Sequence, residues 1–317
     1  MSEHPRRAAS WRHGAWRNRI QSALLILFLL GLVALLGELL FGASGRWLAL
    51  GVGLITVLGA PAAGGQLTLI AYRARFLPPQ RAPELWQLVE QLAQRARLPS
   101  VPRLYLVPSH TVNAFTVGSR NAPSIAVTEG LLHSLTLREL CGVLAHEIAH
   151  IANDDLFVMA LADAASRLTS LLSLMGTLSL LLALPMVLLT SAQIHWFALM
   201  LLLLAPQLAL LAQLGLSRVR EFDADLAGAQ LTGDPEGLAS ALVKIDRANL
   251  SWHGWLLPGW GNPEPSWLRT HPTTSERIQR LLALGPTSAD GPSPPPVRPG
   301  PPQHPRPPRW WPGGIWR

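Results

Sequence analysis

Two long apolar runs lie near the start of the chain, separated by a short linker. The first extends from about Ile20 to Phe41, with Glu38 near its end, and the second from Trp47 to Tyr72 without a charged residue. Each is long enough for a helix across a hydrocarbon core of about 30 Å, and the first is longer than the apolar part of a signal peptide. The linker Gly42–Arg46 allows only a tight turn. The pattern therefore predicts a transmembrane helical hairpin.

A third apolar stretch, from Leu168 to Ser217, contains no Asp, Glu, Lys or Arg over 50 residues. A single helix of that length would extend about 75 Å, so the stretch predicts two spans. We expect the turn near Ser191–Gln193, and Pro185 and Pro206 are tolerable kinks inside a bundle. A buried helical hairpin in a soluble core is the alternative, but this uncharged run is longer than ordinary core helices.

Basic residues flank these runs, and their distribution predicts the orientation. Positive charge precedes the first span, follows the second, precedes the third and follows the fourth, whereas the two short turns carry only Arg46 and His195. The residues concerned are Arg6, Arg7, Arg12, Arg17, Arg19, Arg73, Arg75, Arg81, Arg167, Arg218 and Arg220. The positive-inside rule therefore places both termini and the polar segments in the cytoplasm.

Composition supports a membrane protein and excludes other classes. The chain is 49% hydrophobic and only 14% charged, against about a quarter charged in soluble domains. The formal charge of +7 is spread around apolar runs, which argues against nucleic-acid binding, where basic residues gather on a polar face. The one cysteine, Cys141, excludes an intrachain disulfide and cysteine-rich zinc sites, and we interpret it as a core residue.

The polar segments contain short elements with clear boundaries. Pro83 favours a helix start, with an apolar stripe extending to Leu98. Thr136 opens a capping box that predicts a second helix, which either ends after the histidine motif or continues into the third span. We expect strands at 103–107, 112–117 and 124–128, the last two joined by a polar loop at 118–122. Further helices are expected at 218–231, from 235 to about 249, and from 273 or 274 to about 285.

The predicted organisation is a basic segment at 1–19, membrane hairpins at 20–72 and 168–217, one cytosolic domain formed by 73–167 and 218–285, and a tail at 286–317. The tail is rich in Pro, Arg and Trp, cannot bury a core, and could lie on an anionic membrane surface or have no role. The Trp-rich stretch 250–268 could lie at a membrane interface or shape a substrate cleft.

The helix that begins at Thr136 contains His146-Glu147-Ile148-Ala149-His150. On a helix, positions i and i+4 share a face, so both imidazoles can bind one ion, and zinc suits two nitrogens plus a carboxylate. Glu147 lies beside the open coordination position, where it can take a proton from a water that zinc acidifies. The motif therefore predicts a hydrolytic zinc site rather than two solvent-facing histidines.

Zinc needs a further protein ligand, and Arg220-Glu221-Phe222-Asp223-Ala224-Asp225 supplies the best candidate. Glu221 and Asp225 are four residues apart, hence on one helical face directly after the fourth span. Glu221 could bind zinc, and Asp225 could accept the outer N–H of a ligating histidine. From the residues alone, a solvated acidic face is an equally good interpretation.

Four segments together resemble the bacterial heat-shock membrane peptidases of the HtpX family and, more broadly, the CAAX prenyl proteases. They are VNAFTVGSRNAPSIAVTEGLL at 112–132, HEIAHIANDD at 146–155, REFDAD at 220–225 and THPTTSERI at 270–278. The resemblance extends over about residues 20–285 and includes the hydrophobic layout. It implies a mainly α-helical protein with a small β-sheet, made of four transmembrane helices and a cytosolic zincin-like metallopeptidase domain.

The resemblance also implies residue roles. His146, His150 and Glu221 would bind one Zn²⁺, Glu147 would be the general base, and Asp225 would support a ligating histidine. Asn113, Ala114 and Phe115 would lie on an edge strand that pairs with the substrate backbone, as strand addition allows. His271 and Arg277 would bind the substrate carbonyl or stabilise its oxyanion, although His271 is equally well an ordinary loop histidine.

The expected function is a zinc-dependent endopeptidase of the bacterial inner membrane that cleaves membrane or misfolded proteins from the cytoplasmic side. A prenyl-protein processing enzyme would need an enclosed chamber, for which four spans are few. A zinc-bearing scaffold would have no use for Glu147, and structural zinc usually has four protein ligands. A transporter would need ionisable residues inside the spans, and only Glu38 and His195 qualify, both near ends. The expected partners are polypeptides and the lipid bilayer; the oligomeric state is open.

Overall fold

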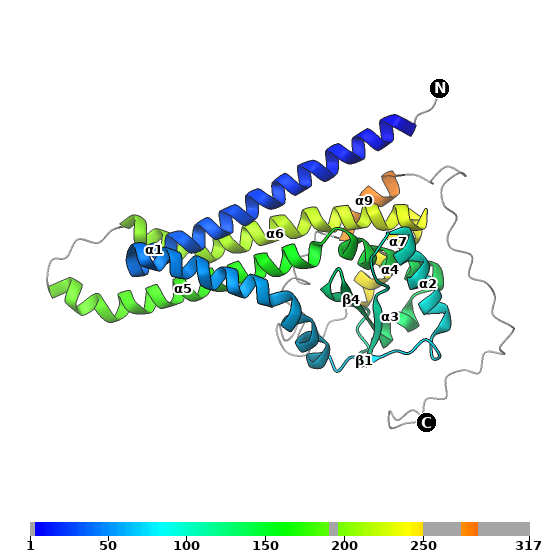
Figure 1. Cartoon of the computed structure of the whole chain (residues 1–317), viewed down its shortest axis with the longest axis horizontal. Coiled ribbons are helices and arrows are strands. Elements are labelled where there is room, and N and C mark those ends of the chain that lie inside the picture. Colours follow the sequence, from blue (N-terminus) through cyan, green and yellow to red (C-terminus); the bar gives the residue numbers. More distant parts are fainter. Residues whose placement is uncertain (1–3, 190–195, 250–273, 285–317) are drawn as a thin grey trace.

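The computed structural model describes residues 4–189, 196–249 and 274–284. Within these residues the protein is mostly helical with one small mixed sheet, as predicted (Figure 1). The elements are α1 (His4–Ala71), β1 (Arg75–Phe76), α2 (Pro83–Arg95), β2 (Arg103–Val107), β3 (Ala114–Ser119), β4 (Ala122–Thr128), α3 (Glu129–Ser134), α4 (Leu137–Ala152), α5 (Asp155–Leu189), α6 (Trp196–Thr232), α7 (Pro235–Asn249) and α9 (Thr274–Ala283).

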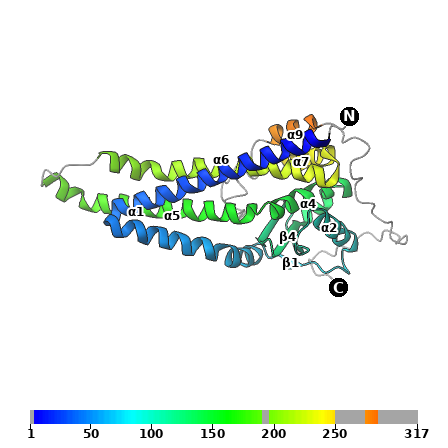
Figure 2. The same cartoon turned by 45° about the horizontal axis from the view of Figure 1, so that its top comes forward.

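Helix α1 reverses direction part way along its length (Figures 1 and 2). The reversal lies at Gly42, whose φ of 70° and ψ of −164° interrupt the helix, a conformation that glycine adopts without steric cost. The two arms touch where they leave the turn: a Cβ on Gly37 would lie 2.6 Å from the Ala49 Cβ. The tight turn expected at Gly42–Arg46 is therefore present, and a larger residue at Gly37 would push the arms apart.

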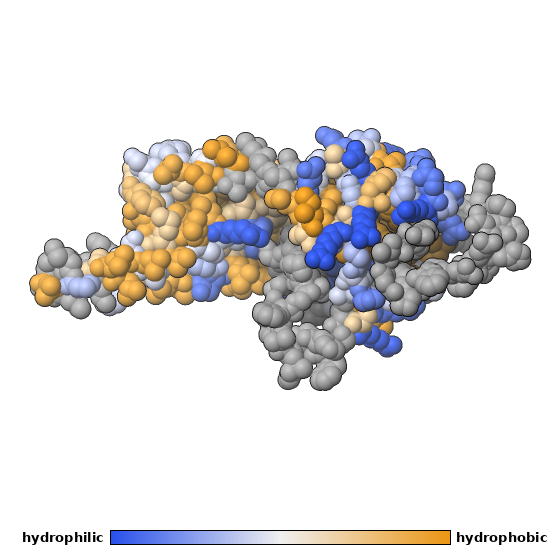
Figure 3. All heavy atoms as spheres, turned by 90° about the horizontal axis from the view of Figure 1, so that it is seen from below, coloured by the Kyte–Doolittle hydropathy of each residue, from blue (hydrophilic) through white to orange (hydrophobic). Residues whose placement is uncertain are grey.

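Among the described residues, three helices are long and apolar enough to cross a membrane: Ile20–Ile55, which includes the Gly42 turn, Asp155–Ala183 and Trp196–Thr232. In each, only 28% of the most apolar 18-residue window is buried inside the protein, so most of its apolar surface faces outward. Figure 3 shows apolar side chains gathered over the end formed by α1, α5 and α6, and hydrophilic ones over the other end. The turn predicted near Ser191 falls outside the described residues.

The sheet lies at the opposite end from the Gly42 turn (Figure 1) and has the strand order β1-β2-β4-β3. β2 and β4 are parallel, whereas β1 pairs with β2 and β3 pairs with β4 in antiparallel fashion. The five-residue loop expected between β3 and β4 is shorter than predicted, because pairing continues to Ser119 and Ala122. Only Arg120 and Asn121 remain as a two-residue turn of the commonest hairpin length.

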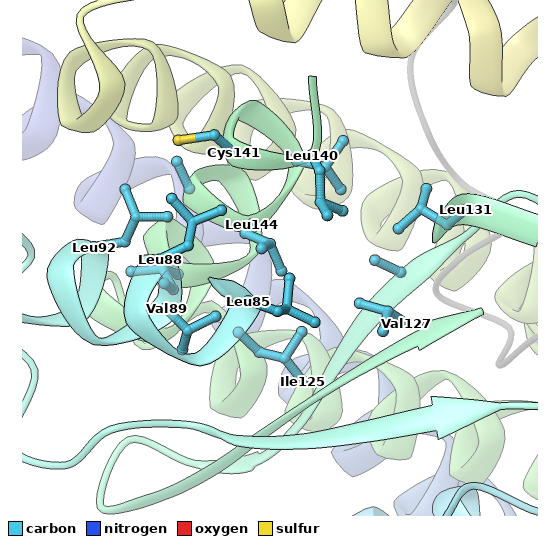
Figure 4. Close-up of a cluster of buried hydrophobic side chains, with 14 of the residues drawn as sticks. Leu85, Leu88, Val89, Leu92, Ile125, Val127, Leu131, Leu140, Cys141 and Leu144 are labelled. Atoms are coloured by element: carbon cyan, nitrogen blue, oxygen red, sulfur yellow. The ribbon is translucent and has the colours of Figure 1, made fainter. Parts of the chain in front are cut away.

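A hydrophobic core between α2, α4 and the sheet holds this domain together (Figure 4). The predicted stripe of α2 faces this core through Leu85, Leu88, Val89 and Leu92, with the helix ending at Arg95 rather than Leu98. Ile125 of β4 and Leu144 of α4 are fully buried opposite it. Cys141 is part of the same cluster, as its apolar helical surroundings predicted.

Helix α4 begins at the predicted capping box: the Thr136 side chain accepts from the Glu139 N–H, and the Glu139 carboxylate accepts from the Thr136 N–H. Continuation of this helix into the third span, one of its expected extents, is wrong. Asp154 adopts a φ of 56°, a left-handed conformation that ends α4 and lets α5 begin in a new direction at Asp155. Helix α6 behaves differently and passes without a break from the bundle into the domain.

The two polar segments meet at α4, which packs against both α6 and α7. Asp234 begins α7 by accepting the Gly237 N–H at 3.0 Å. Helix α9 starts at Thr274 and buries Leu281 against Leu238 of α7. Segments on both sides of the α5–α6 excursion thus surround α4, the helix that contains the zinc motif.

Candidate active site

Helix α4 brings two histidines and a glutamate to one buried position. His146 and His150 are one turn apart, and their Nε2 atoms lie 3.1 Å from each other. His146 is 7% exposed and Glu147 9% exposed, so both belong to the interior rather than to a solvated face. This burial excludes the interpretation of the motif as two solvent-facing histidines.

Glu221 reaches the same point from α6, although it is 71 residues from His150 in the sequence. Its Oε2 lies 3.5 Å from His146 Nε2 and its Oε1 lies 3.5 Å from His150 Nε2. A tetrahedral zinc site with bonds of about 2 Å places its donor atoms about 3.3 Å apart. The donor set and its spacing therefore fit a zinc ion held by His146, His150 and Glu221.

A carboxylate stands behind each imidazole. Asp225 Oδ1 lies 3.0 Å from His146 Nδ1, and Asp155 Oδ2 lies 2.9 Å from His150 Nδ1. The hydrogen bond to Asp155 favours the His150 tautomer that leaves Nε2 as an acceptor, and Asp225 is close enough to His146 Nδ1 for the same role. The sequence predicted Asp225 but not Asp155. The side chain of Asp155 reaches His150 only because the chain changes direction at Asp154, and the sequence did not predict that change.

Two buried arginines hold these carboxylates in place. Arg277 of α9 donates from Nε and Nη2 to Asp225, both at 2.7 Å, and its Nη1 lies 3.1 Å from Glu221 Oε2. Its guanidinium group thus contacts carboxylates of the site itself. The sequence analysis had suggested only substrate binding or oxyanion stabilisation for Arg277. His271, the other residue expected here, lies outside the described residues.

Arg220 holds Asp155 in the same way. Its Nη1 donates to Asp155 Oδ1 at 2.5 Å, and its Nη2 donates to Ser22 Oγ at 2.8 Å. The sequence suggested Arg220 only as a topology signal, yet it is 8% exposed and links helix α1 to the support of His150.

The electrostatics of this cluster favour a cation. Four carboxylates (Glu147, Asp155, Glu221 and Asp225) and two guanidinium groups (Arg220 and Arg277) leave a formal charge of −2 when both histidines are neutral. Burial lowers the pKa of His146 and His150, but Asp225, Asp155 and Glu221 outweigh it and raise the pKa of both imidazoles. A divalent ion would neutralise the excess charge.

Glu147 points toward the sheet. Its Oε2 accepts a hydrogen bond of 2.6 Å from the Thr116 hydroxyl of β3, and both side chains are buried. The sequence analysis did not identify Thr116, since a threonine in a strand pattern carries no signal of its own. The hydrogen bond joins β3 to α4, the helix whose two histidines also contact Glu221 of α6.

Of the residues expected on an edge strand, Ala114 and Phe115 begin β3, an edge strand of the sheet, and Asn113 directly precedes it. The Asn113 carbonyl accepts a hydrogen bond from the Thr128 N–H at 3.0 Å, so the backbone hydrogen-bonding groups of Asn113 point toward β4. In an antiparallel pair this direction alternates. The backbone N–H and C=O groups of Phe115 therefore also point toward β4. Those of Ala114 and Thr116 point to the outer edge of the sheet.

Comparison with known proteins agrees with this site. The sequence pattern of peptidase family M48 matches residues 79–284. A "Protease HtpX homolog" of Acaryochloris marina is 38% identical over 295 residues, covering 84% of this chain and 94% of that protein. A second, from Pyrococcus furiosus, is 36% identical over 297 residues, covering 86% of this chain and 96% of that protein.

Among solved structures, the crystal structure of S. mikatae Ste24p is similar, with a TM-score of 0.49 and 20% identity over 84% of this chain and 66% of that one. The matched range 79–284 contains all three residues of the metal cluster, and the relatives match along nearly their full lengths. The chain therefore belongs to peptidase family M48, among the membrane metalloproteases of the HtpX type.

Proposed function

We propose that this protein is a zinc-dependent endopeptidase that hydrolyses peptide bonds of membrane or misfolded proteins. The observation that carries this proposal is the convergence of His146, His150 and Glu221 on one buried point, with Glu147 beside them on the same helix. Three protein ligands and an adjacent base are the arrangement of a catalytic zinc site, whereas structural sites usually have four protein ligands.

When bound, zinc would polarise the scissile carbonyl and lower the pKa of a water molecule at the site. The Glu147 carboxylate would take the proton of that water and deliver it to the amide nitrogen of the leaving group. Asp225 and Asp155 would hold the Nδ1 protons of His146 and His150, so that both Nε2 lone pairs face the ion.

An extended substrate would add to the outer edge of β3. Ala114 and Thr116 direct their main chains to that edge, which is the geometry that strand addition requires. They are only 6% and 1% exposed, so a substrate strand would reach them only when the surrounding segments give way. Strand addition also requires an extended substrate, which frayed or unfolded polypeptides offer more readily than compact folded ones.

The position of the site next to the helical bundle supports membrane proteins as substrates. Asp155 is the first residue of α5, and Ser22, at the start of the first apolar run, touches Arg220 of the site. With four spans and the arginine distribution described above, the site and both termini would lie on the cytoplasmic side of a bacterial inner membrane. Loops of damaged membrane proteins would be within reach there.

The test is to purify the wild type and Glu147→Gln in detergent, measure bound zinc, and follow cleavage of labelled β-casein. We expect the variant to keep its zinc and lose cleavage by at least about 100-fold, because only the base is removed. Glu90→Gln, an exposed glutamate of α2, is the matched control and should behave like the wild type. Equal cleavage by wild type and Glu147→Gln would refute the proposal.

The ligand assignment is tested separately. Glu221→Ala removes the α6 donor and should lower zinc content below one ion per chain. A stoichiometric zinc content in that variant would show that Glu221 is not a ligand.

A further inference from the structure

Resting on the proposed function, we propose that Thr116 is a positioning residue for the general base. Its hydroxyl donates to Glu147 Oε2 at 2.6 Å, across 31 residues of sequence. Thr116 is 1% exposed and Glu147 9%, so water cannot readily replace this contact.

The contact is fixed from both sides. Thr116 lies in the middle of β3, where pairing with Ile125 sets its height along the sheet, and alternation turns its side chain to the face opposite that of Phe115. Phe115 packs against Tyr72 with ring centroids 4.9 Å apart, which holds the strand against helix α1. Glu147 is fixed by the packing of α4 in the domain core.

A carboxylate has two equivalent oxygens, and this hydrogen bond makes them different. With Oε2 held by Thr116, Oε1 becomes the atom that takes the proton from the attacking water and returns it to the leaving nitrogen. The rotamer of Glu147 is then set before substrate arrives, which removes a conformational search from the chemical step. Thr116 thereby acts on turnover through Glu147.

The same residue also directs its main chain to the outer edge of β3, where a substrate strand would pair. A substitution that changes only the side chain leaves that main chain in place. The positioning role therefore predicts an effect on kcat without one on KM.

The test uses Thr116→Val, which keeps the shape and removes the hydroxyl, and Thr116→Ser, which keeps the hydroxyl. Hydrogen bonds to charged groups contribute enough that we expect kcat for labelled β-casein to fall about 10-fold in Thr116→Val. KM and zinc content should stay at wild-type values, and Thr116→Ser should restore most of the turnover.

The matched control is Thr169→Val, the same change at a fully buried position of α5, where the Oγ1 atom has no hydrogen-bond partner among the described residues. It should leave kcat unchanged. Wild-type kcat in Thr116→Val, or equal losses in the Val and Ser variants, would overturn the inference, as would a change confined to KM or zinc content. Glu147→Gln, assayed alongside, separates a failure of this inference from a failure of the proposed function. If Glu147→Gln is inactive while Thr116→Val is unaffected, only the inference fails. If Glu147→Gln is fully active, the proposed function fails as well.

Discussion

Replacement of Asp155 by asparagine tests whether the support of His150 tunes metal affinity. The carboxylate is 2% exposed and accepts from His150 Nδ1 at 2.9 Å and from Arg220 Nη1 at 2.5 Å. Asparagine has nearly the same volume but only one acceptor oxygen, so its NH₂ group would face one of these two donors. Either His150 loses its orientation or the Arg220 guanidinium loses its buried counter-charge.

The magnitude follows from these two contacts. Loss of a carboxylate behind a ligating histidine typically weakens metal binding about 10- to 100-fold, which corresponds to about 1.4–2.7 kcal/mol. Leaving a buried arginine without its partner costs up to about 3–5 kcal/mol of folding free energy. We therefore expect a higher zinc Kd and a lower Tm in Asp155→Asn, with a Tm deficit that persists at saturating zinc.

The assay is a zinc titration against a competing chelator in detergent, at one fixed pH, together with thermal unfolding. Asp154→Asn is the matched control, because this neighbouring acid is 55% exposed and pairs with a half-exposed Arg120 at 3.1 Å. Exposed pairs contribute at most about 1 kcal/mol, and asparagine tolerates the left-handed conformation at this position. An unchanged zinc Kd in Asp155→Asn, or an equal loss in Asp154→Asn, would refute the reasoning.

Two further predictions concern the packing around α4. A Cβ on Gly228 of α6 would lie 3.0 Å from the backbone nitrogen of His146, whereas one on Gly215 of the same helix would meet nothing within 4 Å. Gly228→Ala should therefore lower stability by about 1–3 kcal/mol and weaken zinc binding. Gly215→Ala should do neither, and thermal unfolding and zinc titration measure both effects. Burial opposes ionisation of Glu139, but hydrogen bonds from Lys244, Ser240 and Thr136 outweigh it and lower its pKa from 4.5 to about 2. Because the folded pKa is the lower one, this stabilisation is present above about pH 4.5 and is lost as the pH falls toward 2. Glu139→Gln should thus cost about 2 kcal/mol at pH 7 in urea unfolding, with a deficit that shrinks below pH 4.5; a constant deficit across that range would contradict the assignment.

Much of the fold follows from local patterns in the sequence. The apolar runs predicted the long helices, Gly42 the reversal of α1, and the Thr136 capping box the start of α4, because each depends on residues within one or two turns. Strand β2 was predicted with its observed bounds for the same reason. The boundaries that differ, such as the β3–β4 turn, depend on pairing between strands, which a single strand's pattern does not contain.

The site divides in the same way. The spacing of His146, Glu147 and His150 on one helix is a local property, so the sequence by itself determined it, and the motif pattern around Glu221 and Asp225 suggested their roles. Only the tertiary structure decided that Asp155, Arg220 and Thr116 belong to the site. The left-handed conformation of Asp154 brings Asp155 to the site. Arg220 comes from a helix 65 residues further along the chain than Asp155, and Thr116 reaches the site because one face of the sheet packs on α4. Hydrogen bonds between distant segments depend on where those segments pack, and packing is set by the whole chain.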